Sequence, residues 1–221
     1  MMVIDDFHPD PHAVRARYLA HADAFERPDG ARYPGRQFEG IPELRDGTVS
    51  RLEALLDRRL AIRNHAVRVA TAADYARDDF SYTVHLDFTP YTAIVYLGLV
   101  DEARPDAEHP EYGTCFYEHV ETGERRIWTR RDPDYEEQLR ARGLGAAEYE
   151  AYKERISRDF FRPERWRVYE RIPYKFNRMV LQDASRLYHS GPDRSFGVDL
   201  ATGRMTENFF LRFDLRGLFE L

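Results

Sequence analysis

Two residues at strand spacing could bind a metal ion together. His85 and Asp87 are separated by a single residue, Leu86. Side chains alternate between the two faces of an extended strand, so His85 and Asp87 project to one side and Leu86 to the other. An imidazole and a carboxylate on one face supply two ligands of the two-histidine, one-carboxylate site that holds non-haem Fe(II). The third ligand has to come from another strand, and His189 is the best candidate.

Length and composition predict a single domain over residues 1–221. A hydrophobic content of 43% is enough to fill a core in a chain of 221 residues. The formal net charge of -6 provides no basic face for nucleic acid, and no segment has the character of a membrane span. Cys115 is the only cysteine, which excludes an internal disulfide and a multi-cysteine zinc site. The first residues include neither a basic region nor an apolar run, so we expect a cytoplasmic protein.

Hydrophobic periodicity predicts helices near the start of the chain, within about 10–60, and strands through most of the rest. Helical spacing covers 11–26, with Asp10 as its N-cap, and 47–60. The charged segment at about 122–167 contains further helical patterns, and we interpret it as an insertion. The predicted strands are 3–7, 66–70, 80–88, 91–100, 113–117, 166–172, 176–182, a segment around 189, and 204–213. This pattern favours a mostly β protein with flanking helices and a jelly-roll core, the cupin-like double-stranded β-helix.

Two of these elements are open to more than one interpretation. The loop at 29–36 carries Tyr33 and Arg36, and such a loop either connects elements or lines a site. In the strand at 66–70 the two valines share one face and Arg68 takes the other. This alternation is typical of a strand with one face in water, so we expect Arg68 to be exposed to solvent.

The segment that begins at His189 resembles the distal half of the Fe(II)- and 2-oxoglutarate-dependent oxygenases. In that superfamily a basic residue on a late strand follows the distal histidine and binds the far carboxylate of 2-oxoglutarate. Arg204 has this place in the sequence, and Thr206 matches the hydroxyl of the R-x-S/T pattern, two residues on. A guanidinium binds a carboxylate with two hydrogen bonds, and a hydroxyl adds one more. Tyr96 is similar to a tyrosine that reaches the same carboxylate in prolyl-hydroxylase-type members.

Three further pieces resemble a bacterial branch of this superfamily that is known only as a domain of unknown function. They are residues 3–7, 33–36 and 113–117. The resemblance is specific for metal and cosubstrate and silent on the substrate. The chain departs from the superfamily pattern in its long charged insertion and in its threonine at 206, where serine is more usual.

The resemblance implies an oxidoreductase, an enzyme that uses Fe(II), 2-oxoglutarate and O2. The implied metal ligands and catalytic residues are His85, Asp87 and His189. The implied cosubstrate contacts are Arg204, Thr206 and Tyr96. Decarboxylation of 2-oxoglutarate gives succinate and CO2 and drives oxidation of an amino acid, a peptide or a small metabolite. Candidate substrate contacts are Tyr33, Arg36 and Arg194.

The carboxylate of Asp87 also bears on the outcome of the reaction. Halogenating relatives in this superfamily replace that carboxylate by a small residue, which opens a coordination position for chloride. Because Asp87 is present here, we expect hydroxylation, or a desaturation or cyclisation, and no chlorination.

Two other functions stay open on the residues alone. A cupin-like metalloprotein, such as an isomerase or a dioxygenase that needs no 2-oxoglutarate, would use the same three ligands and give Arg204 and Thr206 no role. A non-catalytic jelly-roll binding module would bury the histidines as satisfied core residues and hold no metal. Jelly rolls host many functions, so the fold does not separate these alternatives. Metal content and succinate formation do.

Overall fold

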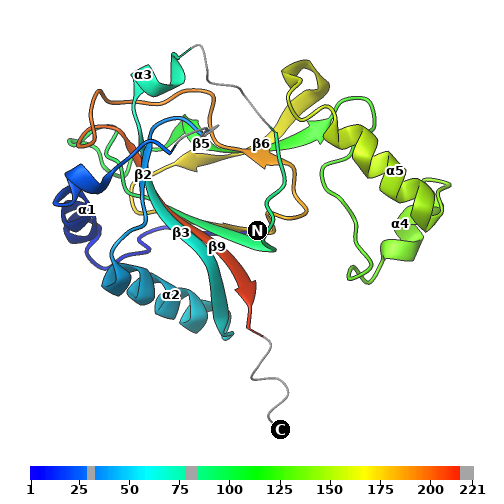
Figure 1. Cartoon of the computed structure of the whole chain (residues 1–221), viewed down its shortest axis with the longest axis horizontal. Coiled ribbons are helices and arrows are strands. Elements are labelled where there is room, and N and C mark those ends of the chain that lie inside the picture. The colour runs from blue at the N-terminus through cyan, green and yellow to red at the C-terminus, as the bar shows by residue number, and fades with distance from the viewer. Residues whose placement is uncertain (29–32, 78–83, 215–221) are drawn as a thin grey trace, which may run out of the picture.

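The computed structural model describes residues 1–28, 33–77 and 84–214, and two antiparallel sheets form its core (Figure 1). In spatial order the larger sheet consists of β1 (Met2–Ile4), β7 (Met179–Gln182), β4 (Tyr91–Tyr96), β9 (Arg204–Phe213), β3 (Leu60–Ala70) and β2 (Arg36–Phe38). The smaller sheet consists of β6 (Trp166–Tyr174), β5 (His109–His119) and β8 (His189–Ser190). An isolated antiparallel bridge between His85 and His189 adds one more segment beside β8.

The path of the chain between the sheets is that of a double-stranded β-helix. From β3 the chain crosses to the bridge at His85, returns to β4 and crosses again to β5. After β6, the antiparallel neighbour of β5, it returns to β7, crosses to β8 and returns to β9. From β3 onwards, successive strands therefore lie in opposite sheets, with β5 and β6 as the exception, which is jelly-roll topology. The predicted mostly β fold with a jelly-roll core is confirmed.

The helices come near the start of the chain, after β3, and between β5 and β6. They are α1 (Pro11–Leu19), α2 (Pro42–Leu56), α3 (Ala72–Tyr75), α4 (Tyr135–Ala141) and α5 (Ala146–Ser157), with short 3-10 helices at Ala22–Ala24 and Pro163–Arg165. Asp10 caps α1 as predicted, because its carboxylate accepts a hydrogen bond from the backbone of Ala13 and a proline follows at the first helical position. Among the described residues no helix is long and apolar enough to cross a membrane.

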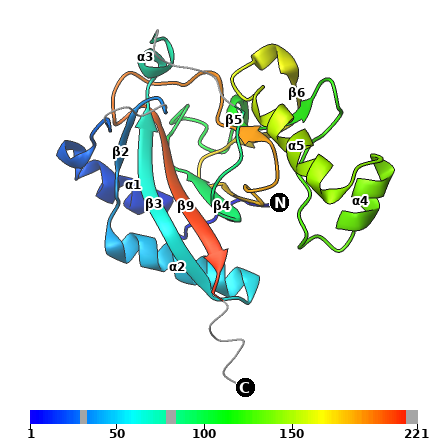
Figure 2. The same cartoon turned by 45° about the vertical axis from the view of Figure 1, so that its right-hand side comes forward.

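Helices α1 and α2 cover the outer face of the larger sheet (Figures 1 and 2). Tyr18 of α1 and Leu52 of α2 belong to the same buried cluster as Met205, Phe209 and Leu211 of β9. These three residues of β9 occupy alternate positions, so they share the outer face of the strand. The residues between them therefore project to the inner face, into the space between the two sheets.

Helix α5 covers the outer face of the smaller sheet. Ile156 of α5 is buried in one cluster with Trp166 and Tyr188, and Leu86 packs against that cluster. Leu86 thus projects away from the side that His85 and Asp87 were predicted to share. Both sheets bury their outer faces under helices, which leaves the inner faces free to form a cavity.

The predicted strand at 80–88 begins outside the described residues, and from 84 onwards it is not a regular strand. It makes one bridge, at His85. The backbone N–H of Asp87 donates a hydrogen bond of 2.8 Å to the carbonyl of Ala184, in the loop that leads to β8. Held at these two points, the segment keeps the alternation on which the prediction depended, since Leu86 packs outward while both potential ligands line the cavity.

Glu207 links the helices to the outer face of β9. It is fully buried, and the hydroxyl of Tyr18 donates a hydrogen bond to its carboxylate. The Thr48 hydroxyl of α2 lies 3.4 Å from the same carboxylate, and His65 Nε2 lies 3.2 Å from it. His8 Nε2 lies 3.4 Å from Glu207 Oε2. A buried carboxylate is stable only with partners of this kind, so these contacts fix where the N-terminal elements sit on the sheet.

We expect Glu207→Ala to lower the free energy of unfolding by about 3 kcal/mol or more, because its removal strands several buried polar groups at once. Urea titration followed by circular dichroism measures the change. Glu43→Ala is the matched control: Glu43 is 74% exposed and 3.9 Å from Arg17, and its loss should cost less than about 1 kcal/mol. Equal stability of both variants would show that the Glu207 contacts are dispensable.

Candidate metal centre

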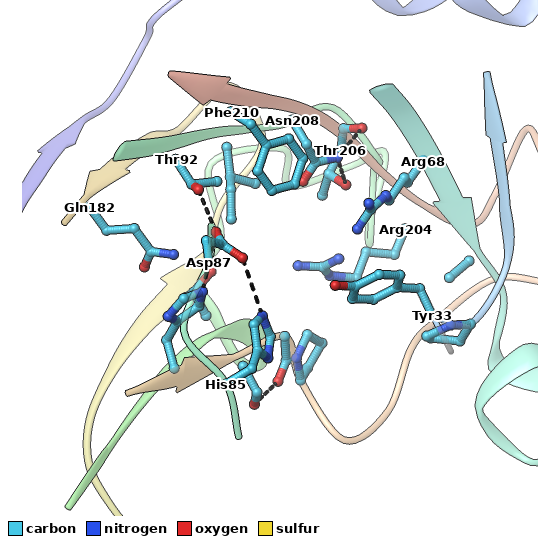
Figure 3. A pocket seen from close by; sticks show the side chains of 18 of the residues that line it. Tyr33, Arg68, His85, Asp87, Thr92, Gln182, Arg204, Thr206, Asn208 and Phe210 are labelled. Carbon is cyan, nitrogen blue, oxygen red and sulfur yellow. Dashed lines mark hydrogen bonds and ion pairs between the residues drawn. The ribbon is translucent and has the colours of Figure 1, made fainter. Parts of the chain in front are cut away.

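A cavity of about 130 Å³ lies between the two sheets. The larger sheet contributes side chains of β3, β4, β7 and β9 to its wall, and the smaller sheet contributes side chains of β5 and β8. From β9 come Arg204, Thr206, Asn208 and Phe210, which alternate with the outward-facing residues of the same strand. The inner face of β9 thus presents three polar side chains and the ring of Phe210 to the cavity (Figure 3).

The cavity brings His85, Asp87 and His189 together. One potential ligand atom of each lies within 4.8 Å of the other two. His85 Nε2 is 3.7 Å from Asp87 Oδ1, and His189 Nε2 is 3.6 Å from Asp87 Oδ2. The backbones of the two histidines exchange hydrogen bonds of 3.0 and 3.2 Å, so the residues stand directly opposite each other and project to the same side. Two imidazoles and one carboxylate at these separations fit a single metal ion.

Neighbouring groups orient these ligands. His189 Nδ1 lies 2.8 Å from the carbonyl oxygen of Leu187, which can only accept, so Nδ1 carries the proton and Nε2 presents its lone pair. The Thr92 hydroxyl donates a hydrogen bond to Asp87 Oδ2. Burial raises the pKa of Asp87, but interactions with His189 and Thr92 outweigh it and hold this pKa below its usual value. Asp87 is therefore an ionised ligand at neutral pH.

Arg204 and Thr206 line the same cavity. Arg204 is 9% exposed, and its Nε donates a hydrogen bond of 2.8 Å to the carbonyl of Tyr112. The end of its guanidinium points into the cavity (Figure 3). Asn208 Nδ2 lies 3.0 Å from Thr206 Oγ1 and donates to it, which leaves the hydroxyl proton of Thr206 available to a ligand. The pair offers the donors that a carboxylate requires.

Tyr96 lies behind this wall. It is fully buried, it is not among the described residues that line the cavity, and its hydroxyl lies 2.7 Å from Thr114 Oγ1. Its ring stacks on Tyr174 with centroids 4.4 Å apart, and the guanidinium carbon of Arg204 lies 5.6 Å from the ring centre. Tyr96 thus supports Arg204 and Thr114, and its direct contact with a cosubstrate stays a prediction.

Tyr33 lies beside the cavity, at the start of the described part of its loop, since residues 29–32 are outside the described residues. Gly35 has a φ of +88°, and a Cβ there would stand 2.2 Å from the carbonyl oxygen of Val69. Only glycine lets the loop approach β3 so closely. The guanidinium carbon of Arg68 lies 4.4 Å from the centre of the Tyr33 ring. Tyr33 is 46% exposed, so it borders the opening of the cavity.

The other two candidate substrate contacts lie elsewhere. Arg36 is exposed and borders a separate hollow beside Asp199. Arg194 is exposed, and its Nε lies 3.4 Å from Asp193 Oδ1. Neither lines the cavity that holds the candidate ligands, and their contact with a substrate stays a prediction.

Two residues that the sequence did not single out as functional line the cavity. The expectation that Arg68 faces solvent is wrong, because the polar face of β3 is the inner face of the jelly roll. The alternation of side chains correctly predicted that Arg68 and the two valines lie on different faces of β3. It did not predict that the face of Arg68 meets a cavity. Gln182 is 1% exposed, and neither its Nε2 nor its Oε1 has a hydrogen-bond partner among the described residues. A glutamine that ends the otherwise apolar strand β7 is the only signal the sequence contains.

The chain belongs to the family of unknown function DUF6445, whose sequence model matches residues 1–77 and 107–211. The matched segments include His189, Arg204 and Thr206. His85 and Asp87 lie in the unmatched gap between the two segments. No curated protein sequence matches the chain.

Several solved structures share the general arrangement of strands at 15% sequence identity or less. HygX from Streptomyces hygroscopicus, with nickel and 2-oxoglutarate bound, has a TM-score of 0.49 and 15% identity over 94% of this chain and 80% of its own. A prolyl hydroxylase from Trichoplax adhaerens, in complex with a hypoxia inducible factor peptide fragment, has a TM-score of 0.47 and 13% identity over 100% and 87%. SnoN, a non-heme alpha ketoglutarate dependent epimerase from nogalamycin biosynthesis, has a TM-score of 0.47 and 12% identity over 96% and 76%. These likenesses are too distant to assign a chemistry to the chain.

We expect His189→Ala to weaken Mn(II) binding by more than about 100-fold, because losing even an outer partner of a metal ligand costs 10- to 100-fold. Calorimetric titration of the purified protein with Mn(II) measures the affinity. His109→Ala is the matched control, since His109 lies near Glu111 and away from the cavity, and it should leave the affinity unchanged. An unaltered affinity in His189→Ala would place the metal elsewhere.

Proposed function

We propose that this protein is a non-haem Fe(II)- and 2-oxoglutarate-dependent oxygenase that hydroxylates an amino acid, a peptide or a small metabolite. One observation carries the proposal. A single cavity holds two histidines and a carboxylate whose potential ligand atoms lie within 4.8 Å of one another, together with the Arg204 and Thr206 pair. The three side chains have the ligand set that suits Fe(II) and leaves coordination positions for other molecules.

Within this proposal His85, Asp87 and His189 hold the metal on one side. When bound, Fe(II) and 2-oxoglutarate supply the oxidising chemistry with O2, and succinate and CO2 are the products of the cosubstrate. The Thr92 hydroxyl donates a hydrogen bond to the Asp87 carboxylate, which favours its ionised form, so Asp87 can neutralise half the charge of a divalent ion. Because this carboxylate fills the place that a halide would need, the expected outcome is hydroxylation, desaturation or cyclisation.

Arg204 and Thr206 bind the far carboxylate of 2-oxoglutarate in this proposal. The Nε of Arg204 is occupied by the Tyr112 carbonyl, which sets the plane of the guanidinium and leaves its terminal nitrogens for two parallel hydrogen bonds. Thr206 adds its hydroxyl proton. Tyr96 acts as a positioning residue through its ring contact with Arg204. A cupin-like enzyme without 2-oxoglutarate would give this pair no ligand.

The proposed activity predicts succinate release that depends on substrate. The purified protein is incubated with Fe(II), ascorbate and 2-oxoglutarate against pools of amino acids and peptides, and succinate is measured. We expect at least one pool to raise succinate above the level without substrate, and His189→Ala to remove the increase. A wild-type protein that binds Fe(II) but gives no measurable affinity for 2-oxoglutarate would contradict the proposal and favour the cupin-like alternative.

We expect Arg204→Gln to weaken 2-oxoglutarate binding by about 10- to 100-fold, because hydrogen bonds to a charged group contribute about 1.5–3 kcal/mol. Calorimetry with the Mn(II)-loaded protein measures this affinity, and Mn(II) binding itself should not change. Arg212→Gln is the matched control: Arg212 lies on the same strand but is exposed. If the Arg212 variant loses affinity and the Arg204 variant does not, the cosubstrate site has been assigned to the wrong arginine.

A further inference from the structure

Arg68 is a cation in the cavity that forms no salt bridge within the described part of the chain. It projects from β3 into the space between the sheets (Figure 3). Its Nε is buried and has no hydrogen-bond partner, and the described residues form no ion pair with it. Its contacts are the faces of two aromatic rings, 4.4 Å from the Tyr33 centre and 6.0 Å from the Phe210 centre. Burial lowers the pKa of Arg68, and the attraction of the Asp87 carboxylate offsets this only in part.

The net charge of the cavity favours the binding of one more anion. Among the described residues that line it, two guanidinium groups, of Arg68 and Arg204, stand against one carboxylate, Asp87. A divalent metal ion and the dianionic 2-oxoglutarate have equal and opposite charges, so their joint binding does not alter this balance. One positive charge is therefore in excess after both have bound. A buried cation without a counter-ion is costly, and a ligand that carries one negative charge removes the cost.

The two arginines also differ in depth. Arg204 is 9% exposed, and the Tyr112 carbonyl and the rings of Tyr96 and Tyr174 hold it from behind. Arg68 instead packs under Tyr33, whose ring is 46% exposed at the opening of the cavity. A molecule that enters after the cosubstrate meets Arg68 first. This favours a contact of Arg68 with the primary substrate over a second contact with 2-oxoglutarate.

The same sheet presents a second polar group, on β7, that lacks a partner among the described residues. The side-chain amide of Gln182 is buried, and neither its nitrogen nor its oxygen is hydrogen-bonded among the described residues. It faces the cavity across from Arg68 (Figure 3). A buried amide of this kind loses the free energy of its hydrogen bonds until a ligand supplies them. A polar ligand that lies across the inner face of the larger sheet, from β3 to β7, can reach both groups.

We propose that Arg68 binds a carboxylate of the primary substrate, which makes the substrate a small carboxylic acid such as a free amino acid or the C-terminal residue of a peptide. The inference rests on the proposed function, since the charge balance includes the metal and 2-oxoglutarate. The planar guanidinium takes the carboxylate through two parallel hydrogen bonds. Tyr33 stacks on the outer face of that guanidinium and holds its plane.

The test uses the full-length protein loaded with Ni(II) and 2-oxoglutarate, so that binding is measured without turnover. The probes are free and N-acetylated amino acids, each as the acid and as its primary amide, and binding is followed by the melting temperature and by ligand-observed NMR. The variants are Arg68→Gln and, as matched control, Arg212→Gln. The acids and amides differ only in the charge of the carboxyl group. The N-acetyl forms separate free amino acids from peptide C-termini.

We expect at least one acid to bind the loaded wild-type protein while its amide does not. Arg68→Gln should weaken that acid by about 10- to 100-fold, because a hydrogen-bonded charge pair is lost, and should leave the Kd for 2-oxoglutarate close to the wild-type value. Equal binding of acids and amides, or no binding of any acid, would overturn the inference. So would a loss of 2-oxoglutarate affinity in Arg68→Gln as large as that in Arg204→Gln. The uptake of Ni(II) and 2-oxoglutarate by the wild-type protein is measured first, as a separate step. If the protein binds neither, that result contradicts the proposed function itself.

Discussion

The alternation of side chains along β9 is the constraint on which the rest of the structure depends. Met205, Glu207 and Phe209 face the N-terminal helices, while Arg204 and Thr206 face the cavity. The two sets of side chains cannot move independently, because a shift of the strand register by one residue turns every side chain to the opposite face. β9 pairs with β3 on one side and β4 on the other, so the packing of α1 and α2 on the outer face fixes the register of the chemistry on the inner face.

The candidate metal centre depends on a second constraint, in the smaller sheet. His85 and His189 are far apart in the sequence and meet because their backbones exchange hydrogen bonds. On the outer side, Leu86 and Tyr188 pack in one cluster with Ile156 of α5. The charged segment that contains α4 and α5 therefore supports the layer from which two of the three candidate ligands project.

Buried polar groups in this protein fall into two kinds. The carboxylate of Glu207 is surrounded by donors, so it is satisfied by the fold and stabilises it. The Nε of Arg68 and the amide of Gln182 are buried and have no such partners in the described part of the chain, and both line the cavity. Folding gains nothing from leaving polar groups unsatisfied, and these two differ from the other unsatisfied groups of the described residues in that they line the cavity, where a ligand could supply the missing hydrogen bonds. Thr92 also lines the cavity, but its hydroxyl already donates a hydrogen bond to Asp87, so it belongs to the satisfied groups.

The sequence by itself determined the elements and the faces of their side chains. The period of two predicted that β9 would run over 204–213 and that His85 and Asp87 would share a side, because alternation is a local property of an extended chain. The need for a third ligand singled out His189, and the resemblance to a known superfamily supported it and added Arg204 and Thr206 as expected cosubstrate contacts. Only the tertiary structure decided what each face meets. The polar face of β3 looked solvent-exposed and proved to be a cavity wall, since a charged residue beside water and one beside a ligand have the same local pattern. Tyr96 and Gln182 show the same limit, because whether a side chain reaches the cavity or lies behind its wall depends on the packing of the opposite sheet.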